Sequence, residues 1–425
     1  MLIIINKPSH NREILPFPYS MLILKLPSKV CGEKTMGCTC RNTEYLSKKK
    51  SLRIILKSID KVLKALKLFS GNKIKNIQPP PPGEVHKILI IKPDHLGDML
   101  LLTSVLGLIK NRYKDAVIDI VCGSWSKPVL SNNPYIRQIH IINNSSINRS
   151  ASGRFGKLTE YIKTLFPALG KIRKEHYDIC LFMRSRRGNM IYLARLGKVS
   201  YSIGHGTAGF GPLLSCQVPW NRGEHETGHF LEILRPLGIE APPEPDGLSY
   251  GLYPSGEEKA SVSAYWQENF SKFDKTAVVH PGAGTLLKTL PAAKWKEVIA
   301  ILEKNGYKVF ITGSAAGAEK DLINGIASPS SSICAGIWSI QELALFFKKA
   351  SLIVTVDSLS SHLAGWSGVK TIVFFCGMGD EKQWRPLGKN INILSLDKPC
   401  SPCETGCEDM ACMDFDVNIL SELII

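Results

Sequence analysis

Apolar runs of strand length alternate with helical periodicities along most of this chain. In the first half, strand-like runs lie at 87–92, 116–123, 136–142 and 177–183, and helical patterns at 99–113 and 157–175. After the proline-rich stretch 241–247, strand-like runs return at 276–284, 307–317, 351–357 and 369–377, and helical patterns at 295–306 and 341–350. Such alternation is typical of parallel sheets covered by helices. The pattern predicts an α/β fold of two similar halves, 86–250 and 251–425.

Residues 1–85 have a different, basic character. Within them, segment 51–70 repeats apolar residues at helical spacing and places lysines and an arginine at the other angles. This pattern predicts a basic amphipathic helix, followed by a stiff PPPPG linker at 79–83. A helix of this kind can lie in the headgroup layer of an anionic membrane, or it can pack on the next domain. The sequence leaves both possibilities open.

The chain is strongly basic, and its positive charge favours certain classes of binding partner. Its 425 residues contain 53 Lys and Arg against 37 Asp and Glu, a formal net charge of +16. This excess favours nucleic acid, an acidic membrane or phosphorylated substrates. No recognised nucleic-acid motif is present, so we expect no nucleic-acid partner. The first residues lack a signal-peptide pattern, and no apolar stretch reaches the roughly 18 residues of a membrane span. We therefore expect a cytoplasmic protein.

A carboxylate stands at the first predicted strand-to-helix turn, in KPDHLGD (92–98). Ligands of such sheets bind at the carboxyl ends of the strands, where Asp98 would lie in the first turn of a helix. An acid in that position can carry chemistry, or it can simply stabilise the helix dipole. The G-x-G-x-x-G fingerprint is missing, which argues against a dinucleotide site.

Two further clusters follow strands in the second half. In HPGAGTLLKTLP (280–291), glycines can bring backbone N–H groups close to a phosphate, and Lys288 can supply countercharge. An ordinary glycine-rich turn is the alternative. In TVDSLSSHLAG (355–365), a strand ends at Asp357 and serines precede an apolar helix that has His362 in its first turn. The serines can form an anion site or merely cap the helix.

Two clusters remain open in their chemistry. Arg184, Arg186 and Arg187 in MRSRRG (183–188) follow a strand of the first half and can meet acceptor phosphates or form a solvated loop. Near the C-terminus, four cysteines stand at C-x2-C-x3-C-x4-C spacing: Cys400, Cys403, Cys407 and Cys412. They can hold zinc or an iron–sulfur cluster, or they can have a structural role without metal.

The motifs DHLGDMLLLTS, HPGAG…K…P and TVDSLSSHLAG, in this order, resemble those of the ADP-heptose:lipopolysaccharide heptosyltransferases, glycosyltransferase family 9. The resemblance covers about residues 86 to 420. It implies a GT-B architecture, with two Rossmann-like domains that face a central cleft: the acceptor binds the first and the nucleotide-sugar donor the second. It also implies inverting transfer that requires no metal or other cofactor.

The resemblance also implies roles for single residues. Asp98 matches the family's proposed general base, which takes the proton of the attacking acceptor hydroxyl. Lys288 matches the donor-binding lysine, and Glu319 falls where the family has an acid that binds the ribose. The remaining donor segment matches at Asp357, Ser358, Leu359, Ser360 and His362.

Two departures leave the donor sugar open. Leu290 stands where many relatives have tryptophan, and the loop at 376–380 reads CGMGD instead of the usual G-x-T-D-P. We expect a glycosyltransferase that moves a heptose from ADP-heptose onto a lipid-linked, lipopolysaccharide-type glycan at the inner face of the cytoplasmic membrane. The alternative is a non-catalytic nucleotide-sugar-binding or membrane-associated scaffold of the same fold. The acceptor and the oligomeric state stay open.

Overall fold

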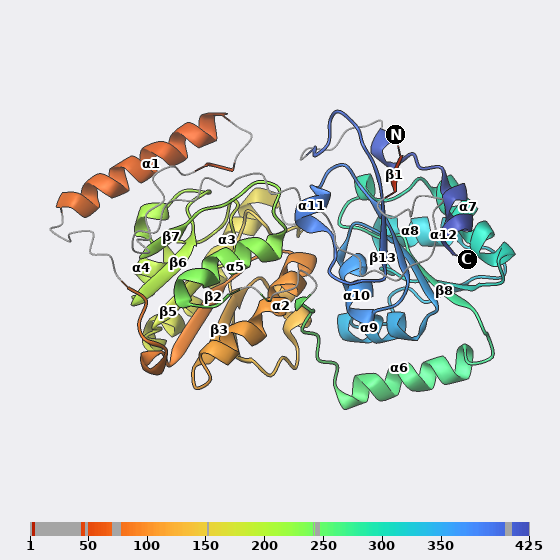
Figure 1. The fold of residues 1–425 in the computed structure, drawn as a ribbon, viewed down its shortest axis with the longest axis horizontal. Helices are drawn as coiled ribbons and strands as arrows, with labels where there is room; N and C mark the ends of the chain where they lie inside the picture. The colour runs from red at the N-terminus through yellow and green to blue at the C-terminus, as the bar shows by residue number, and fades with distance from the viewer. Residues whose placement is uncertain are drawn as a thin grey trace, which may run out of the picture.

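The chain forms two α/β halves that lie side by side (Figure 1). The computed structural model describes residues 2–4, 44–46, 50–69, 78–150, 153–240, 242, 247–403 and 410–424. Each half is built on a parallel sheet, and both termini lie in the second half. The α/β class and the GT-B architecture expected above are confirmed.

The first sheet has the strand order β4-β3-β2-β5-β6-β7, and its pairings are all parallel. Its strands are β2 (Lys87–Ile91), β3 (Val117–Cys122), β4 (Ile136–Ile141), β5 (Ile179–Phe182), β6 (Tyr201–His205) and β7 (Cys216–Val218). The helices of this half are α2 (Leu96–Arg112), α3 (Gly153–Glu175), α4 (Leu193–Leu196) and α5 (Glu226–Leu234), with 3₁₀ turns η1 (Pro82–Glu84), η2 (Ser124–Leu130), η3 (Gly211–Leu213) and η4 (Arg235–Leu237).

Helices cover both faces of this sheet, as the run of buried residues in β2 requires. Ile88 and Ile90 face the cluster that contains α2, whereas Leu89 and Ile91 face the cluster that contains α3 and α4. The alternation follows from the two-residue period of a strand.

The second sheet has the order β1-β13-β12-β11-β8-β9-β10. Its strands are β8 (Thr276–His280), β9 (Lys308–Ile311), β10 (Ser332–Ile333), β11 (Leu352–Val356), β12 (Thr371–Phe375) and β13 (Ile391–Leu396), all parallel, plus β1 (Leu2–Ile4), which pairs antiparallel with β13. The helices are α6 (Gly256–Asn269), α7 (Ala292–Lys304), α8 (Gly317–Ile326), α9 (Ile340–Lys349), α10 (Leu359–Ser367), α11 (Glu381–Trp384) and α12 (Leu420–Leu423), with 3₁₀ turns η6 (Leu286–Lys288), η7 (Ala411–Met413) and η8 (Val417–Ile419).

One hydrophobic core runs through both halves. Helix α2 is buried over nearly its whole circumference from Met99 to Leu106, because the first sheet packs on one side of it and α10 on another. A helix that is apolar all round is expected only in such a place. This shared core fixes the N-terminus of α2 against the second half.

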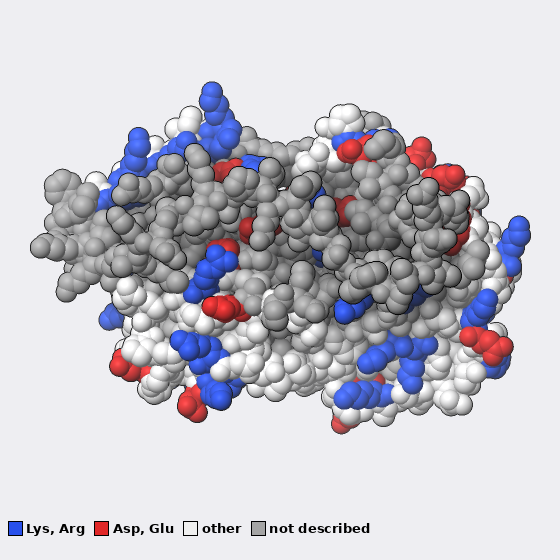
Figure 2. Space-filling view, in the orientation of Figure 1, with Lys and Arg blue, Asp and Glu red and all other residues white. Residues whose placement is uncertain are grey.

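The amphipathic helix predicted at 51–70 is α1 (Lys50–Phe69), and it packs on the first half. Asp60, its single acid, is buried and accepts hydrogen bonds from the Phe210 N–H at 2.7 Å and the Tyr45 hydroxyl at 2.8 Å. Leu56 of α1 lies against Gly209, where a Cβ would come within 2.8 Å of it. One face of the helix is thus docked, while its Lys and Arg side chains between residues 50 and 64 are exposed. Figure 2 shows Lys and Arg gathered at the end of the molecule that α1 covers.

Candidate active site

The N-termini of α2 and α10 meet between the halves. Helix α2 begins at Leu96, directly after KPDH, so that Asp98 lies in its first turn, as predicted. Gly97 faces the other helix: a Cβ there would lie 3.0 Å from Cδ2 of His362 and 4.0 Å from Cα of Leu359. The missing side chain lets the two helix ends approach each other. The acid of the first half and the serine-rich segment of the second half therefore border one space.

A buried charge network lies beneath Asp98. Lys92 is completely buried, and its Nζ is 3.2 Å from both Asp94 Oδ2 and Glu226 Oε1. The same Nζ lies 4.7 Å from the ring centroid of Phe230. Arg184 pairs with the other oxygen of Asp94. Buried charges are stable only when they are paired in this manner.

This network sets the protonation of Asp98. Burial raises the pKa of Asp98 to about 7, and the nearby carboxylates of Asp94 and Glu226 add to the effect, while Lys92 and Arg184 oppose it. Burial alone would raise the pKa of Asp94 as well, but Arg184 and Lys92 outweigh it and hold that pKa far below its usual value. Two neighbouring acids thus have opposite protonation behaviour. A carboxyl group that titrates near neutral pH is suited to accept a proton from a substrate.

The residues of the loop 280–291 and of the segment 357–362 converge around the start of α10. Lys288, at the end of η6, donates to Oδ2 of Asp357 at 2.5 Å. Ser358 is the residue before α10, and its hydroxyl donates to the Gly282 carbonyl at 3.0 Å. Ser360 lies within hydrogen-bond distance of the Ser358 hydroxyl, at 2.7 Å. The strand ends of β8 and β11 thus bring the two glycine- and serine-rich loops together.

Glu319 lies where the glycines of two loops leave space for it. It belongs to the first turn of α8, and its Oε1 accepts the Ser314 N–H at 2.9 Å. A Cβ at Gly282 would lie 1.8 Å from that oxygen, and one at Gly313 would lie 2.5 Å away. The carboxylate is therefore part of the same loop cluster as Lys288.

His362 is held as a neutral imidazole. Burial lowers its pKa to about 3, and the charges of His225 and Lys288 lower it further. The Tyr250 hydroxyl accepts the Leu387 N–H at 2.8 Å and lies 2.7 Å from Nδ1 of His362, within hydrogen-bond distance. The other ring nitrogen, Nε2, is the one nearer to Gly97.

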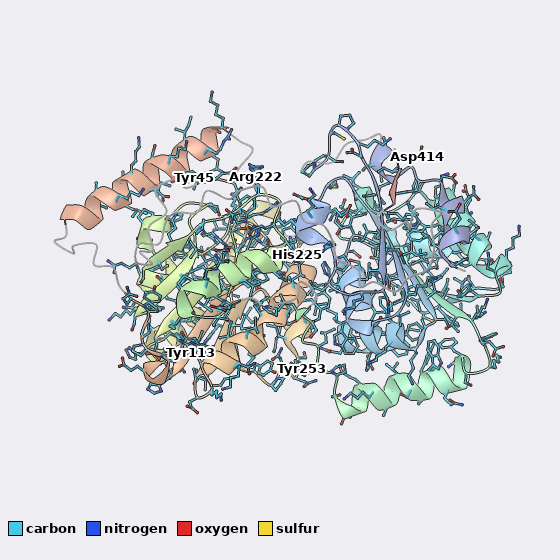
Figure 3. All side chains as sticks on the ribbon, in the orientation of Figure 1. Tyr45, Tyr113, Arg222, His225, Tyr253 and Asp414 are labelled. Carbon is cyan, nitrogen blue, oxygen red and sulfur yellow. The ribbon has the colours of Figure 1, made fainter. Side chains whose placement is uncertain are left out.

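The predicted arginine loop borders a cavity of about 1330 Å³ that opens beside this site. Arg184 is mostly buried against Asp94, whereas Arg187 is exposed. Arg186 stacks on Trp384 with its guanidinium carbon 5.6 Å from the ring centroid. All three arginines line the cavity, together with Arg222 and Tyr45. Figure 3 shows Tyr45 and Arg222 close to α1.

The short helix α11 of the second half reaches into the first. Gln383 donates to Oε2 of the buried Glu226 at 2.8 Å. Next to it, His225, which Figure 3 places between the halves, lies with Nε2 2.8 Å from the Arg385 carbonyl. The second half therefore contacts the charge network under Asp98 directly, through Gln383.

Sequence reasoning missed several of these residues. Lys92 and Asp94 stand in the predicted turn, and a lysine that directly follows a buried strand was an unused signal. Glu226 and Gln383 carry no such signal, because only the fold brings Glu226 to Lys92 and Gln383 to Glu226. Arg149 also had none: it extends from a loop of the first half to the Gly284 carbonyl, with Nη1 3.5 Å away.

The two departures noted above lie in different places. Leu290 is buried in the hydrophobic core of the second half, so it does not border the cluster around Lys288 and Asp357. The loop at 376–380, by contrast, faces it: a Cβ at Gly379 would lie 3.3 Å from Oδ2 of Asp357.

The cysteine cluster falls only partly within the described residues. Cys407 lies outside them; Cys400 is exposed, Cys403 partly so, and Cys412 buried, with its Sγ 3.8 Å from that of Cys376. Among the residues that the structure describes, no group of three or more His, Cys, Asp or Glu side chains is arranged to hold a metal ion.

Comparisons with known proteins point in one direction. The family profile "Glycosyltransferase family 9 (heptosyltransferase)" matches residues 248–413. The chain is 28% identical over 305 residues to lipopolysaccharide heptosyltransferase 3 of Escherichia coli strain K12. This alignment covers 69% of this chain and 83% of that protein.

Two solved structures share the fold. The glycosyl transferase family 9 protein from Veillonella parvula superimposes with a TM-score of 0.63 at 15% identity, covering 80% of this chain and 96% of the other. The E. coli ADP-heptose lipopolysaccharide heptosyltransferase II superimposes with a TM-score of 0.61 at 18% identity, covering 80% and 97%.

Proposed function

Since the chain belongs to glycosyltransferase family 9, the heptosyltransferases, and is a glycosyltransferase, we propose that it moves a heptose from ADP-heptose onto a lipid-linked, lipopolysaccharide-type glycan. The observation that carries the proposal is the position of Asp98. This carboxyl group has a pKa near 7 and lies across Gly97 from the start of α10, the segment assigned to the donor.

In the proposed reaction, Asp98 accepts the proton of an acceptor hydroxyl while its oxygen attacks the anomeric carbon of the donor. The bond from that carbon to the diphosphate breaks as the new glycosidic bond forms. Because base and leaving group act from opposite sides of the sugar, the configuration at the anomeric carbon inverts. Proton transfer of this kind is worth roughly 10²–10⁴-fold in rate.

The departing diphosphate gains negative charge, and the second half offers groups that can balance it. Lys288 and the N-terminal N–H groups of α10, the segment Ser358, Leu359, Ser360 and His362, surround one corner of the site. Electrostatic stabilisation by such fixed groups can take the place of a metal ion, so our scheme includes none. In the same scheme Glu319 binds the ribose and Asp357 lies near the sugar.

We assign the acceptor to residues 86–250 and the donor to residues 251–425. The cavity supports the first assignment, because most of its lining residues, including Arg184 of the charge network under Asp98, belong to the first half, and because it is large enough for several sugar units. Arg186, Arg187 and Arg222 would meet phosphate or carboxylate groups of the acceptor. Arg184 instead would position Asp94 and thereby support the charge network.

We place the protein in the cytoplasm, bound peripherally to the inner face of the cytoplasmic membrane that carries its acceptor. The basic helix α1 supports this location, since its outward lysines suit anionic lipid. Within the described residues, no helix combines the length and apolar character needed to cross a membrane.

A turnover assay tests the proposal directly. Purified protein is incubated with ADP-heptose and a heptose-deficient lipopolysaccharide core, and release of ADP is followed together with the mass of the glycan. We expect both products with the wild type and a loss of at least about 100-fold in kcat for Asp98→Asn. Binding of ADP-heptose without turnover on any acceptor would instead identify a non-catalytic nucleotide-sugar binder, and stabilisation by UDP or GDP alone would exclude heptose as the sugar.

A further inference from the structure

Helix α3 carries an apolar stripe that is exposed and does not pack on the sheet. Phe155, Leu158, Ile162 and Phe166 follow one another at intervals of three or four residues, so they lie along one side of the helix. Phe155 is 84% and Phe166 64% exposed. The opposite side of α3, with Ala168 and Ile172, packs on the sheet. A surface helix normally covers its apolar side, so this stripe points to an interaction surface.

Helix α1 carries a second stripe of the same kind. Its docked face includes Leu56 and Asp60, but Ile55, Val62 and Leu66 remain exposed, with Ile55 at 53% and Leu66 at 59%. These three residues are spaced at seven and four positions and share one side of the helix. The two helices therefore present unburied apolar side chains from the same half of the molecule.

Both helices carry more basic than acidic residues, and their acids bind groups of their own domain. Helix α1 contains six Lys and Arg and only one acid, Asp60, which is buried and hydrogen-bonded. Helix α3 contains six Lys and Arg and two acids. Both of these acids bind their own domain: Glu160 accepts from Asn143 at 2.9 Å, and Glu175 pairs with Lys87 at 2.9 Å. Apolar stripes accompanied by cations, with the acids turned inward, match an anionic lipid surface better than a protein of mixed charge.

The same two helices border the arginine-lined cavity. Leu52 and Leu56 of α1 and Tyr161 of α3 are among its lining residues. Tyr161 directly precedes Ile162 of the stripe. An acceptor that is anchored by acyl chains must keep those chains in the bilayer while its sugar enters the cavity, and a membrane-facing surface beside the opening meets this requirement.

We propose that the α3 stripe Phe155, Leu158, Ile162 and Phe166, together with the exposed stripe of α1, inserts into the headgroup layer of an anionic membrane and holds the mouth of the acceptor cavity against it. The surface thus acts on a lipid-anchored acceptor in place, and this purpose rests on the function proposed above. The insertion itself does not: it is measurable without any turnover.

The experiment uses the full-length protein and vesicles of phosphatidylglycerol and phosphatidylethanolamine, with phosphatidylcholine vesicles for comparison. The variant Phe155→Ser/Phe166→Ser removes the two exposed aromatics, and Ile333→Ser is the matched control, since Ile333 is 46% exposed on the edge strand β10 of the other sheet. Sedimentation measures vesicle binding. We expect the wild type and the control to bind anionic vesicles, and the double variant to bind at least about tenfold more weakly.

Two additional readouts separate the possible causes. Turnover of the double variant on a deacylated, water-soluble acceptor should equal that of the wild type, whereas turnover on acceptor embedded in vesicles should fall. A Leu158→Trp variant should show fluorescence quenching by brominated lipids. Unchanged vesicle binding of the double variant would overturn the proposal, and so would a change in its oligomeric state, because a second copy would then be what covers the stripe. Absence of turnover by the wild type on either acceptor, with its binding to anionic vesicles intact, would count against the proposed function and not against the insertion.

Discussion

Replacing Asp98 by asparagine should make the protein less active and more stable. The pKa of Asp98 is raised from 3.8 to about 7, chiefly by burial and then by the carboxylates of Asp94 and Glu226. The folded protein therefore resists ionisation of this group, while the unfolded chain ionises it freely. Since one pKa unit corresponds to about 1.4 kcal/mol, the ionised carboxylate destabilises the wild type by up to about 4 kcal/mol above pH 7.

The sign and the pH window follow from the direction of the shift. Below about pH 3 both states hold the proton, so the group has no effect on stability. As the pH rises from 4 to 7, the unfolded state loses the proton first, and the wild type becomes progressively less stable. Asparagine carries no charge at any pH. We expect the free energy of unfolding of Asp98→Asn to exceed that of the wild type by about 4 kcal/mol at pH 8, by about 2 kcal/mol at pH 5 and by less than about 1 kcal/mol at pH 4.

Urea unfolding at these three pH values, combined with initial rates, checks the prediction. The catalytic role also predicts that the activity of the wild type rises with pH up to about 7, and that this limb is absent from the residual activity of the variant. Glu342→Gln is the control: Glu342 lies in the first turn of α9 and accepts the Ser339 N–H at 2.9 Å. Glutamine can accept the same hydrogen bond, so loss of the charge near the helix N-terminus should destabilise by about 0.3–1 kcal/mol.

The opposite outcome would refute this reasoning. If Asp98 only supports the dipole of α2, then Asp98→Asn should lose about 0.3–1 kcal/mol of stability at pH 8 and keep most of its activity. A variant that is less stable than the wild type at pH 8, or one that retains the acid limb of the pH profile, would show that Asp98 is not a proton acceptor in the reaction.

Four other substitutions test the remaining parts of the site. Gly97→Ala places a Cβ 3.0 Å from His362, so it should separate the starts of α2 and α10 and lower kcat by about tenfold, measured at saturating donor. Lys288→Ala should abolish the thermal stabilisation by ADP-heptose, which for the wild type amounts to about 2.7 kcal/mol at 100 times the dissociation constant. Gly282→Ala should displace Glu319 and raise the KM for the donor while kcat changes little, as steady-state kinetics would show. Arg149→Gln should raise the donor KM and weaken its dependence on salt, since Arg149 reaches the donor loop at Gly284; an unchanged salt dependence would exclude a role in donor binding.

The pattern of the sequence was sufficient for the elements that the core buries most completely. The strands β2, β3 and β11 and the helices α2 and α9 follow from apolar runs and periodicity, because parallel strands are covered on both faces and must be apolar throughout. Strands β6, β7 and β13 were not predicted. Their short runs are less continuously apolar, and pairing in the sheet rather than local propensity makes them strands.

For the site, local motifs were enough to select candidate residues but not to predict their protonation. Asp98, Lys288 and the segment 357–362 were recognisable because strand ends and helix starts place them at one edge of each sheet. Nothing local could show that Glu226 would raise the pKa of Asp98, since Glu226 lies 128 positions further along the chain and its other partner, Gln383, belongs to the second half.

The helix at 51–70 shows the same division. The sequence predicts that this helix is amphipathic and basic, and it leaves open whether the helix packs on the next domain or contacts a membrane. Only the tertiary structure divides its apolar residues into a docked side, held by Leu56 and the buried Asp60, and an exposed side with Ile55 and Leu66. Sequence periodicity fixes which residues share a face of a helix, whereas which face finds a partner depends on contacts between segments far apart in the chain.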